Sequence, residues 1–487
     1  MIKRRPGLGS IFGSVLALTL TTQAGFSADA TDMAMKAKAG ETSAADAVEA
    51  ALARAAEKEA LNAFITIDAE GARKAAAEAD AAQTHGPLYG VVIAVKDNIA
   101  SAGLATSAGT PALKDWAPGK DATVLERLRA AGAILVGKTN MHELAFGITS
   151  NNAGFGAVHN AWDETKFAGG SSGGTAAAVA AGIVPAGLGT DTGGSVRLPS
   201  ALNGIAGLRP TVGRYPQDGI VPISHTRDTA GPMARSVRDL ALLDGVITGA
   251  SDALETVDLS QMRFGLPAAF VSGLDPETKA VFDDAVATLQ DAGATFVEME
   301  LPGLIDLNDK VGFPLALYEV KRDLARFLEE NDTGITIEDV AAGVASPDVK
   351  FVFDNLVLGD QAIPAAVYDA AMRDFRPAMQ ALYAEAFARL DLDALAFPTT
   401  KLPARPIEGS DMEVELNGAK VPTFNTFIAN TDPGSNAGLP GLSLPAGVTA
   451  SGLPVGLELD GPMFTDRRLL AIGQAVEAVL GFEGLAD

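Results

Sequence analysis

The stretch from residue 169 to residue 199 reads GGSSGGTAAAVAAGIVPAGLGTDTGGSVRLP, and it decides the fold class. Two glycine-rich loops, at 169–174 and 189–197, flank a run of small residues and a short apolar segment. A flexible linker would share this composition. However, the first loop runs directly into the helix-compatible residues 175–181 and the apolar residues 183–186. We therefore expect both loops to be embedded in packed structure.

Strand and helix patterns alternate on both sides of this stretch. Short apolar runs typical of buried strands occupy 64–67, 91–95, 133–136, 394–398, 441–445 and 454–459. Helical periodicity is found in two segments within 31–82 and again at 123–131 and 467–480. This alternation predicts an α/β fold with a mixed β-sheet core wrapped by helices.

The segment 262–387 differs from the rest because it is more helical, more charged and poorer in motifs. We interpret it as a helical insertion, or cap, on a single domain that spans 31–487. The length of 487 residues would also accommodate two average domains. No residue in 262–387 can be singled out as a determinant of specificity.

Residues 1–30 have the layout of a secretory signal peptide. Three basic residues at 3–5 precede an apolar run at 11–22, and small residues follow, with possible cleavage after Ala24, Ala28 or Ala30. The Arg4–Arg5 pair suggests export by the twin-arginine pathway, although Pro6–Gly7 fits the pattern of that signal poorly. A membrane anchor is the alternative, but the apolar run is shorter than the roughly 20 residues of a span. We expect a periplasmic or secreted protein without stable membrane association after cleavage.

Composition excludes several classes of function. The formal net charge of −24 repels phosphate backbones, so we expect no nucleic-acid partner. The absence of cysteine removes disulfides, thiol nucleophiles and cysteine metal ligands together. His142–Glu143 begins an H-E-x-x-H zinc motif, but Phe146 stands at its fifth position, so we predict no metal site and a structural role for His142.

The remaining polar groups favour chemistry that pairs serine with lysine. Lys96 ends an apolar strand, where burial would lower its pKa and make it a general base. A lysine that extends from the sheet edge into solvent is the alternative. Gly193 and Gly194 allow backbone N–H groups to converge on an oxyanion. A phosphate loop is the competing use, but its Gly-Lys-Ser/Thr ending is missing. No histidine lies in a convincing triad motif, so a lysine base is the economical choice.

The run 169–199 resembles the amidase signature, with Ser171 and Ser195 separated by the family's 24 positions (171 to 195). The motifs VKDN at 95–98, GKTNM at 137–141 and DTAGPMAR at 228–235 also fit the family pattern. The resemblance covers nearly all of the chain after the predicted signal peptide. It implies the amidase fold and an enzyme that hydrolyses carboxamides.

The resemblance also implies a role for individual residues. Ser195 would be the acylated nucleophile, Ser171 the proton relay after a cis peptide bond, and Lys96 the base. Backbone amides of Thr192, Gly193 and Gly194, together with that of Ser195, would bind the oxyanion. Asp191 and Arg197 would fix the loop by hydrogen bonds and charge pairing. No metal or organic cofactor is implied.

Within the family, residues 141–147 and 430–438 are similar to those of indoleacetamide and mandelamide hydrolases, which take arylalkyl primary amides. On that basis Ala145, Phe146 and Ser150 would line the substrate pocket. Three other functions are compatible with parts of the sequence: a peptide or oligoamide hydrolase, an amidotransferase A-type subunit and an inactive amidase-like binding protein. A homodimer is common among such relatives, but no sequence feature requires one.

Overall fold

The computed structural model describes residues 1, 29–250, 252–482 and 484. Residues 2–28 lie outside the described residues, and with them most of the predicted signal peptide. The first helix, α1, begins at Ala30, whose N–H donates to Asp239 Oδ2 at 2.7 Å. Within the described part of the chain, no helix combines the length and apolar character needed to cross a bilayer.

One sheet of 11 strands forms the core, in the order β1-β3-β2-β6-β8-β7-β14-β15-β11-β9-β10. The strands are β1 Phe64–Ile67, β2 Val92–Lys96, β3 Ile134–Thr139, β6 Ala186–Asp191, β7 Ala206–Arg209, β8 Thr229–Ala234, β9 Arg263–Pro267, β10 Thr295–Met299, β11 Ala394–Pro398, β14 Gly441–Val448 and β15 Pro454–Asp460. β2 runs parallel to β3 and β6, whereas β8 runs antiparallel to β6 and β7. The prediction of an α/β fold with a mixed sheet is therefore confirmed.

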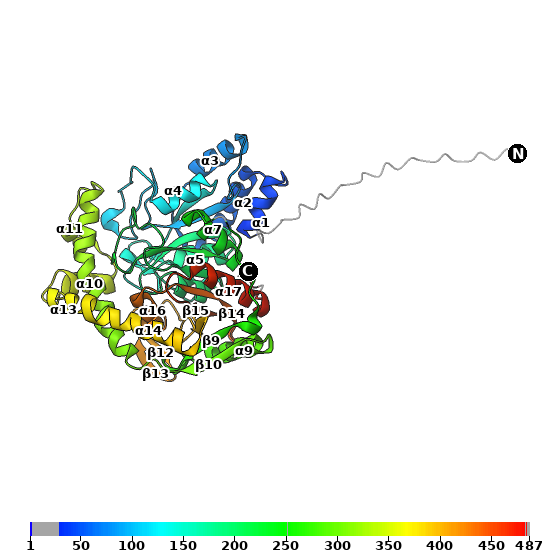
Figure 1. The fold of residues 1–487 in the computed structure, drawn as a ribbon. Helices are drawn as coiled ribbons and strands as arrows, with labels where there is room; N and C mark the ends of the chain where they lie inside the picture. Colours follow the sequence, from blue (N-terminus) through cyan, green and yellow to red (C-terminus); the bar gives the residue numbers. More distant parts are fainter. Residues whose placement is uncertain (2–28, 251, 483, 485–487) are drawn as a thin grey trace.

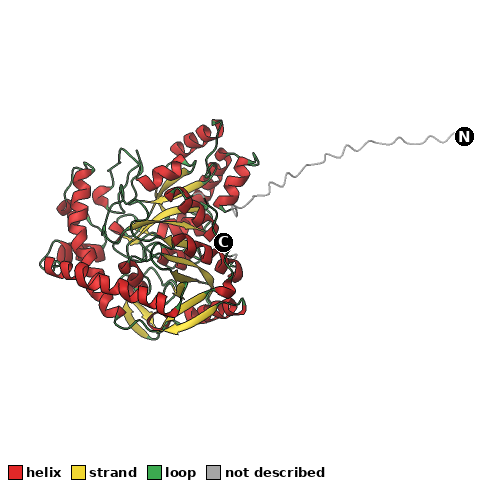
Figure 2. Ribbon diagram, viewed as in Figure 1, coloured by secondary structure: helices red, strands yellow, loops and turns green. Residues whose placement is uncertain are grey.

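Helices surround this sheet (Figure 2). They are α1 Ala30–Lys38, α2 Ala44–Glu57, α3 Ala69–Ala81, α4 Thr123–Ala130, α5 Gly173–Ala180, α6 Arg197–Asn203, α7 Val237–Thr248, α8 Ala268–Val271, α9 Pro276–Asp291, α10 Leu304–Glu330, α11 Ile337–Gly343, α12 Pro347–Phe351, α13 Ala365–Ala370, α14 Arg376–Leu390, α15 Thr423–Ile428, α16 Asp432–Ala437 and α17 Asp466–Leu480. Short hairpins pair β4 Asn151–Asn152 with β5 Gly156–Ala157, and β12 Glu413–Leu416 with β13 Ala419–Pro422.

The N-terminal segment contains one more helix than the sequence pattern predicts. Gly40 adopts a φ of 73°, a left-handed conformation that ends α1. Ser43 then starts α2 through a capping box with Asp46. These two local signals divide what the periodicity alone presents as a single helix.

The segment 262–387 is not entirely helical. Its first part contains β9 and β10, which pair in parallel and form one edge of the sheet. The helices that follow from Leu304 onward include α10, α11 and α13, which lie together on one flank of the molecule (Figure 1). The two strands escape the sequence analysis because their short apolar runs are interrupted by Gly265 and Glu298.

The abundance of small residues is explained where α5 packs on the sheet. A Cβ atom on Gly187 of β6 would lie 2.7 Å from Thr175 Cγ2 of α5. One on Gly174 would lie 2.3 Å from the carbonyl oxygen of Asn140. Larger side chains cannot occupy either position without moving backbone. This close packing fixes the loops at 169–174 and 191–197 against the carboxyl ends of β2 and β6.

Candidate active site

Lys96 and Ser171 are in direct contact. Lys96 is the last residue of β2, and its Nζ lies 2.8 Å from Ser171 Oγ. The same ammonium group donates to Thr190 Oγ1 at 2.7 Å, and Asn98 Nδ2 donates to that hydroxyl at 3.0 Å. β2 pairs in parallel with β6, Val95 standing opposite Leu188, which brings Lys96 beside Thr190.

The Lys96 side chain is completely buried, so the alternative in which it extends into solvent is wrong. Burial lowers the pKa of Lys96 to about 7, and the negative charges of Asp191 and Asp228 only partly oppose this shift. A lysine with that pKa exchanges a proton readily at neutral pH. The hydroxyls of Ser171 and Thr190, at 2.8 and 2.7 Å, are both within reach of Lys96, and the loop of Ser171 also contacts that of Ser195.

The loop that carries Ser195 is held against the loop that carries Ser171. The N–H of Ser172 donates to the carbonyl oxygen of Ser195 at 3.2 Å. The peptide bond between Gly170 and Ser171 is cis, as the resemblance implies. Ser195 is 9% exposed, immediately before α6, and is therefore at the boundary between the core and the outside.

Asp191 and Arg197 form the centre of a buried ionic network under this loop. Asp191 accepts from Arg197 Nε at 3.1 Å, and Arg209 NH1 lies 3.1 Å away on its other side. Burial alone would raise the pKa of Asp191, but the two guanidinium groups outweigh it and hold that pKa well below its usual range. Glu458 completes the network by accepting from Arg197 NH1 at 2.8 Å.

The Asp191 carboxylate also holds the backbone of the loop. It accepts from the N–H of Gly194 at 2.7 Å and from that of Val196 at 3.2 Å. The N–H of Gly194 is therefore already engaged, which the sequence analysis did not foresee when it placed Gly194 in the oxyanion hole. Among the described residues, no acceptor faces the N–H groups of Gly193 and Ser195. The Thr192 hydroxyl donates to Asp228 Oδ1 at 2.6 Å.

The three residues expected to line a substrate pocket have different surroundings. Ser150 is fully buried, and its hydroxyl accepts from the N–H of Gly173 at 3.2 Å while it donates to the carbonyl oxygen of Ser171 at 3.5 Å. It therefore supports the Ser171 loop. Ala145 and Phe146 instead belong to an apolar cluster, in which Phe146 also meets Phe353 edge to face at 5.4 Å.

That cluster, which we call the acyl cluster, consists of Met141, Ala145, Phe146, Ile223 and Ala316. It is linked indirectly to the two loops that carry Ser171 and Ser195. The N–H of His142, beside Met141, donates to the carbonyl oxygen of Ser171 at 3.1 Å. The N–H of Ile223 donates to Asp228, which also holds Thr192.

Several polar residues of the site were not predicted. Asp228 was quoted within a motif but given no role, and Thr190 stands one position before Asp191 in the signature. Arg209 and Glu458 had no local signal, because each acts through a partner distant in sequence. Their contact with Arg197 and Asp191 becomes visible only once β7 and β15 are placed in the sheet.

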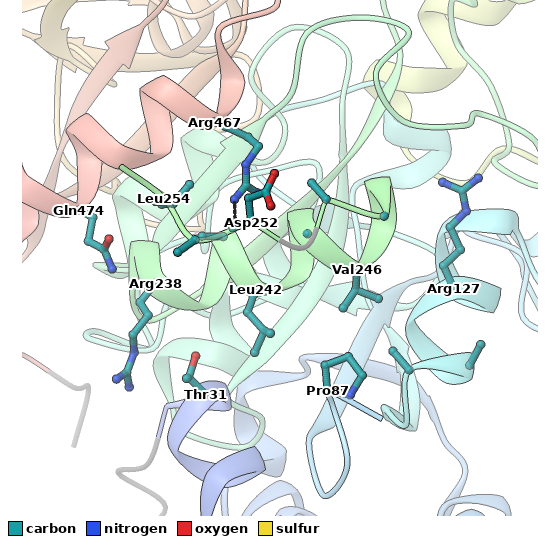
Figure 3. Close-up of a pocket in the computed structure, with 17 residues that line it drawn as sticks. Thr31, Pro87, Arg127, Arg238, Leu242, Val246, Asp252, Leu254, Arg467 and Gln474 are labelled. Atoms are coloured by element: carbon teal, nitrogen blue, oxygen red, sulfur yellow. Dashed lines mark hydrogen bonds between the residues drawn. The ribbon is translucent and has the colours of Figure 1, made fainter. Parts of the chain in front are cut away.

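Two other polar or hollow features lie apart from these residues. His225, Glu319 and Asp323 bring ligand atoms within 4.8 Å of one another, but Ser224, Thr226, Tyr368 and Arg322 already hydrogen-bond to this group. A cavity of about 890 Å³ lies beside α7, between Arg127, Arg238 and Arg467 (Figure 3). None of the predicted catalytic residues lines it.

A buried lysine of lowered pKa, a hydroxyl bonded to it and a glycine loop with N–H groups that find no acceptor in the described part of the chain are elements that an acyl-transfer hydrolase uses. The family comparison gives the particular class. The sequence matches the family model described as Amidase over residues 46–470, and the chain belongs to the amidase family of hydrolases that cleave C–N amide bonds.

The chain is 45% identical over 441 residues to the indoleacetamide hydrolase of Rhizobium radiobacter, covering 90% of this chain and 94% of that protein. It is 44% identical over 454 residues to the mandelamide hydrolase of Pseudomonas putida, covering 89% and 88% of the two chains. Among solved structures, the native peptide amidase from Stenotrophomonas maltophilia superposes with a TM-score of 0.79 at 31% identity, covering 94% of this chain and 98% of that one. The fold and the family are therefore both those expected from the resemblance.

Proposed function

We propose that this amidase hydrolyses small arylalkyl carboxamides to ammonia and the carboxylic acid through an acyl-enzyme on Ser195. The observation that carries the proposal is the contact of 2.8 Å between Lys96 Nζ and Ser171 Oγ, next to the Ser195 loop. Serine becomes a useful nucleophile only when a neighbouring base removes its proton. Lys96, with a pKa of about 7, can serve as that base near neutral pH.

In the proposed first step, Ser171 passes its proton to neutral Lys96 and accepts the proton of Ser195. Ser195 Oγ forms a bond to the carbonyl carbon, and the oxyanion accepts hydrogen bonds from the N–H groups of Gly193 and Ser195, with Thr192 adjacent. The proton then returns through Ser171 to the amide nitrogen, the C–N bond breaks and ammonia leaves. Water attacks the acyl-enzyme by the reverse relay and releases the acid.

The preference for an arylalkyl group rests on the acyl cluster and on the relatives. The cluster supplies an aromatic ring, Phe146, and apolar side chains, and it is linked to both loops through His142 and Asp228. Apolar surface of this kind favours a hydrophobic acyl group by about 25 cal/mol per Å² buried. Proteins named as indoleacetamide and mandelamide hydrolases share about 45% of their residues with this chain.

The test is ammonia release from indoleacetamide, mandelamide, acetamide and a C-terminally amidated peptide, with Ser195→Ala assayed alongside. We expect release from the two arylalkyl amides and none in the variant. Preferential release from the amidated peptide would replace the arylalkyl assignment with a peptide amidase. Activity that persists in Ser195→Ala would contradict the serine mechanism.

We also propose export of the protein with removal of the N-terminal signal, on the basis of the sequence of residues 1–30. Edman sequencing of the protein recovered from periplasmic and cytoplasmic fractions tests this. An intact N-terminus found only in the cytoplasmic fraction would refute it. Cleavage after Ala30 would remove the first residue of α1, so we expect cleavage at Ala24 or Ala28.

A further inference from the structure

The carboxylate of Asp228 connects two parts of the site that the proposed chemistry uses separately. Its Oδ1 accepts from the Thr192 hydroxyl at 2.6 Å, at the start of the oxyanion loop. Its Oδ2 accepts from the N–H groups of Ile223 and Ser224 at 2.8 and 2.9 Å. Ile223 belongs to the acyl cluster, so a single buried carboxylate fixes one loop relative to the other.

The surroundings of Asp228 differ from those of Asp191, the other carboxylate that acts on Lys96. Asp191 is neutralised by direct contact with Arg197 and Arg209. Asp228 forms no ion pair among the described residues, and its acceptor positions are filled by a hydroxyl and backbone N–H groups. An unneutralised anion in a buried site acts strongly on a neighbouring ammonium group.

Burial raises the pKa of Asp228, and Arg227 offsets its negative charge only in part. Arg227, the next cation in the chain, directs its guanidinium to Asp432 at 2.5 Å and to the carbonyl oxygen of Gly312 at 2.8 Å. The other titratable groups along this loop are His225 and, from α10, Glu319 and Asp323, which interact with one another. Lys96 is left as the cation for which Asp191 and Asp228 are the principal anions.

We infer that Asp228 is a positioning residue that holds the oxyanion loop against the acyl cluster. This inference rests on the proposed role of Lys96 as base. It assigns two separable effects to one side chain: a geometric effect through Thr192 and Ile223, and an electrostatic effect on Lys96.

The test compares Asp228→Asn with Thr192→Val, which breaks the contact of 2.6 Å but keeps the charge of Asp228. Two rates are measured as functions of pH: ammonia release from indoleacetamide, and covalent labelling of Ser195 by a fluorophosphonate, which needs no amide substrate. Asp228→Asn should lower kcat and move the acidic limb of both profiles to lower pH by about one unit, because a nearby anion raises a lysine pKa by roughly that amount. Thr192→Val should lower kcat several-fold and leave the acidic limb in place.

Asp228→Asn places an amide NH₂ where one of the two carboxylate oxygens accepted, so this variant can fail to fold. Asp228→Glu is then the second variant to measure, because it keeps the negative charge but moves the carboxylate by one methylene group. It should lose activity, and its acidic limb should move less than that of Asp228→Asn, because the charge is kept. The inference is overturned if a folded Asp228→Asn keeps the wild-type limb in both assays, or if Asp228→Glu moves the limb as far as Asp228→Asn does.

The outcomes also separate this inference from the proposed function. Failure to hydrolyse indoleacetamide would refute the substrate assignment, while the labelling profile would still report on Asp228. Retention of labelling in Lys96→Met would refute the base itself.

Discussion

The strands and glycine loops between Val92 and Ala234 differ sharply from the helices that follow Leu304. The first region buries charged side chains completely, among them Lys96, Lys138 and Arg197. The helical region instead exposes aromatic rings, with Phe313 and Phe351 about half exposed at 48% and 56%. The difference shows that the buried charged groups of the proposed site lie among the strands and glycine loops, whereas the helical region leaves some of its aromatic rings in contact with solvent.

The two regions nevertheless meet at a few contacts. Glu319 of α10 accepts from Ser224 at 2.5 Å, and Asp348 of α12 lies 2.9 Å from His142 Nε2. These contacts touch the loops that hold the site. In addition, Ala316 of α10 belongs to the acyl cluster, and Thr431, just before α16, donates to the carbonyl oxygen of Gly193 at 2.7 Å. We therefore expect substitutions in the helical region to adjust activity and those in the glycine loops to abolish it.

The largest effect is expected for Lys96→Met. Loss of the base should lower kcat/KM about 10⁴- to 10⁶-fold, the range found when one member of a catalytic triad is removed. Methionine fills a similar volume and removes a buried charge, so unfolding by urea should show no loss of stability. Lys138→Met is the matched control. Asp97 is its ion-pair partner at 3.6 Å, so Lys138→Met should instead destabilise the fold by about 3–5 kcal/mol.

The second-largest effect is expected for Arg197→Met. It leaves Asp191 and Glu458 buried with less positive charge, which costs about 3–5 kcal/mol when one partner of a buried ion pair is removed. Urea denaturation measures this loss directly. Arg197→Lys should recover little of it, because an ammonium group cannot reproduce the fork of bonds that the guanidinium makes. Full recovery by lysine would show that charge alone is sufficient.

The pH dependence follows from the pKa of about 7 for Lys96. Lysine acts as a base only when neutral, so kcat/KM should fall about 50-fold between pH 7 and pH 5. The unfolded chain retains this proton up to the ordinary lysine pKa of about 10.4, so Lys96 should make stability rise with pH between about 7 and 10. Lys96→Met should remove that contribution, and a profile with no acidic limb near pH 7 would contradict the assignment.

A smaller effect is expected for Phe146→Ala. Removing the ring from the acyl cluster should reduce kcat/KM for indoleacetamide about tenfold relative to acetamide, given roughly 1–3 kcal/mol for such apolar contacts. Phe351→Ala is the control, since its ring is more than half exposed in the helical region. If Phe146→Ala lowers kcat/KM equally for indoleacetamide and acetamide, the acyl cluster does not determine substrate specificity.

The smallest effect is expected for Glu319→Gln. The glutamine can still accept from Ser224 or Thr226 through its amide oxygen, so kcat/KM should fall only a few-fold. Steady-state kinetics with indoleacetamide measure this change. If Glu319→Gln lowers kcat/KM as much as Lys96→Met does, the helical region is as important for activity as the glycine loops.

The sequence was most informative where a function depends on a local run of residues. The signature placed Lys96 and Ser171 in one site, and the contact of 2.8 Å between them was not needed to predict their proximity. The terminal helix was predicted at 467–480 and is found at Asp466–Leu480, because Gly481 ends it in a left-handed conformation. Features that depend on a short run of residues can be predicted from the sequence without knowledge of the fold.

Features that depend on distant partners could not be predicted in this way. Glu458 meets Arg197 across 261 positions of sequence, and Asp228 meets Thr192 across 36. The engagement of the Gly194 N–H by Asp191 depends on the exact path of the loop, which composition does not specify. The edge strands β9 and β10 were missed because a short strand with a glycine or a charged residue gives a weak periodic pattern.

The parallel register of β2 against β6 has a consequence for how such enzymes can diverge. Ile93, Ala94 and Val95 stand opposite Ala186, Gly187 and Leu188, and Lys96 follows directly. Successive residues of a strand face opposite sides of the sheet, so inserting or deleting one residue within β2 would turn the amine away from Ser171. Changes in chain length should therefore be tolerated in the connecting segments and eliminated from β2. The pairing of β2 with β6 therefore fixes the number of residues that can precede Lys96 in the strand.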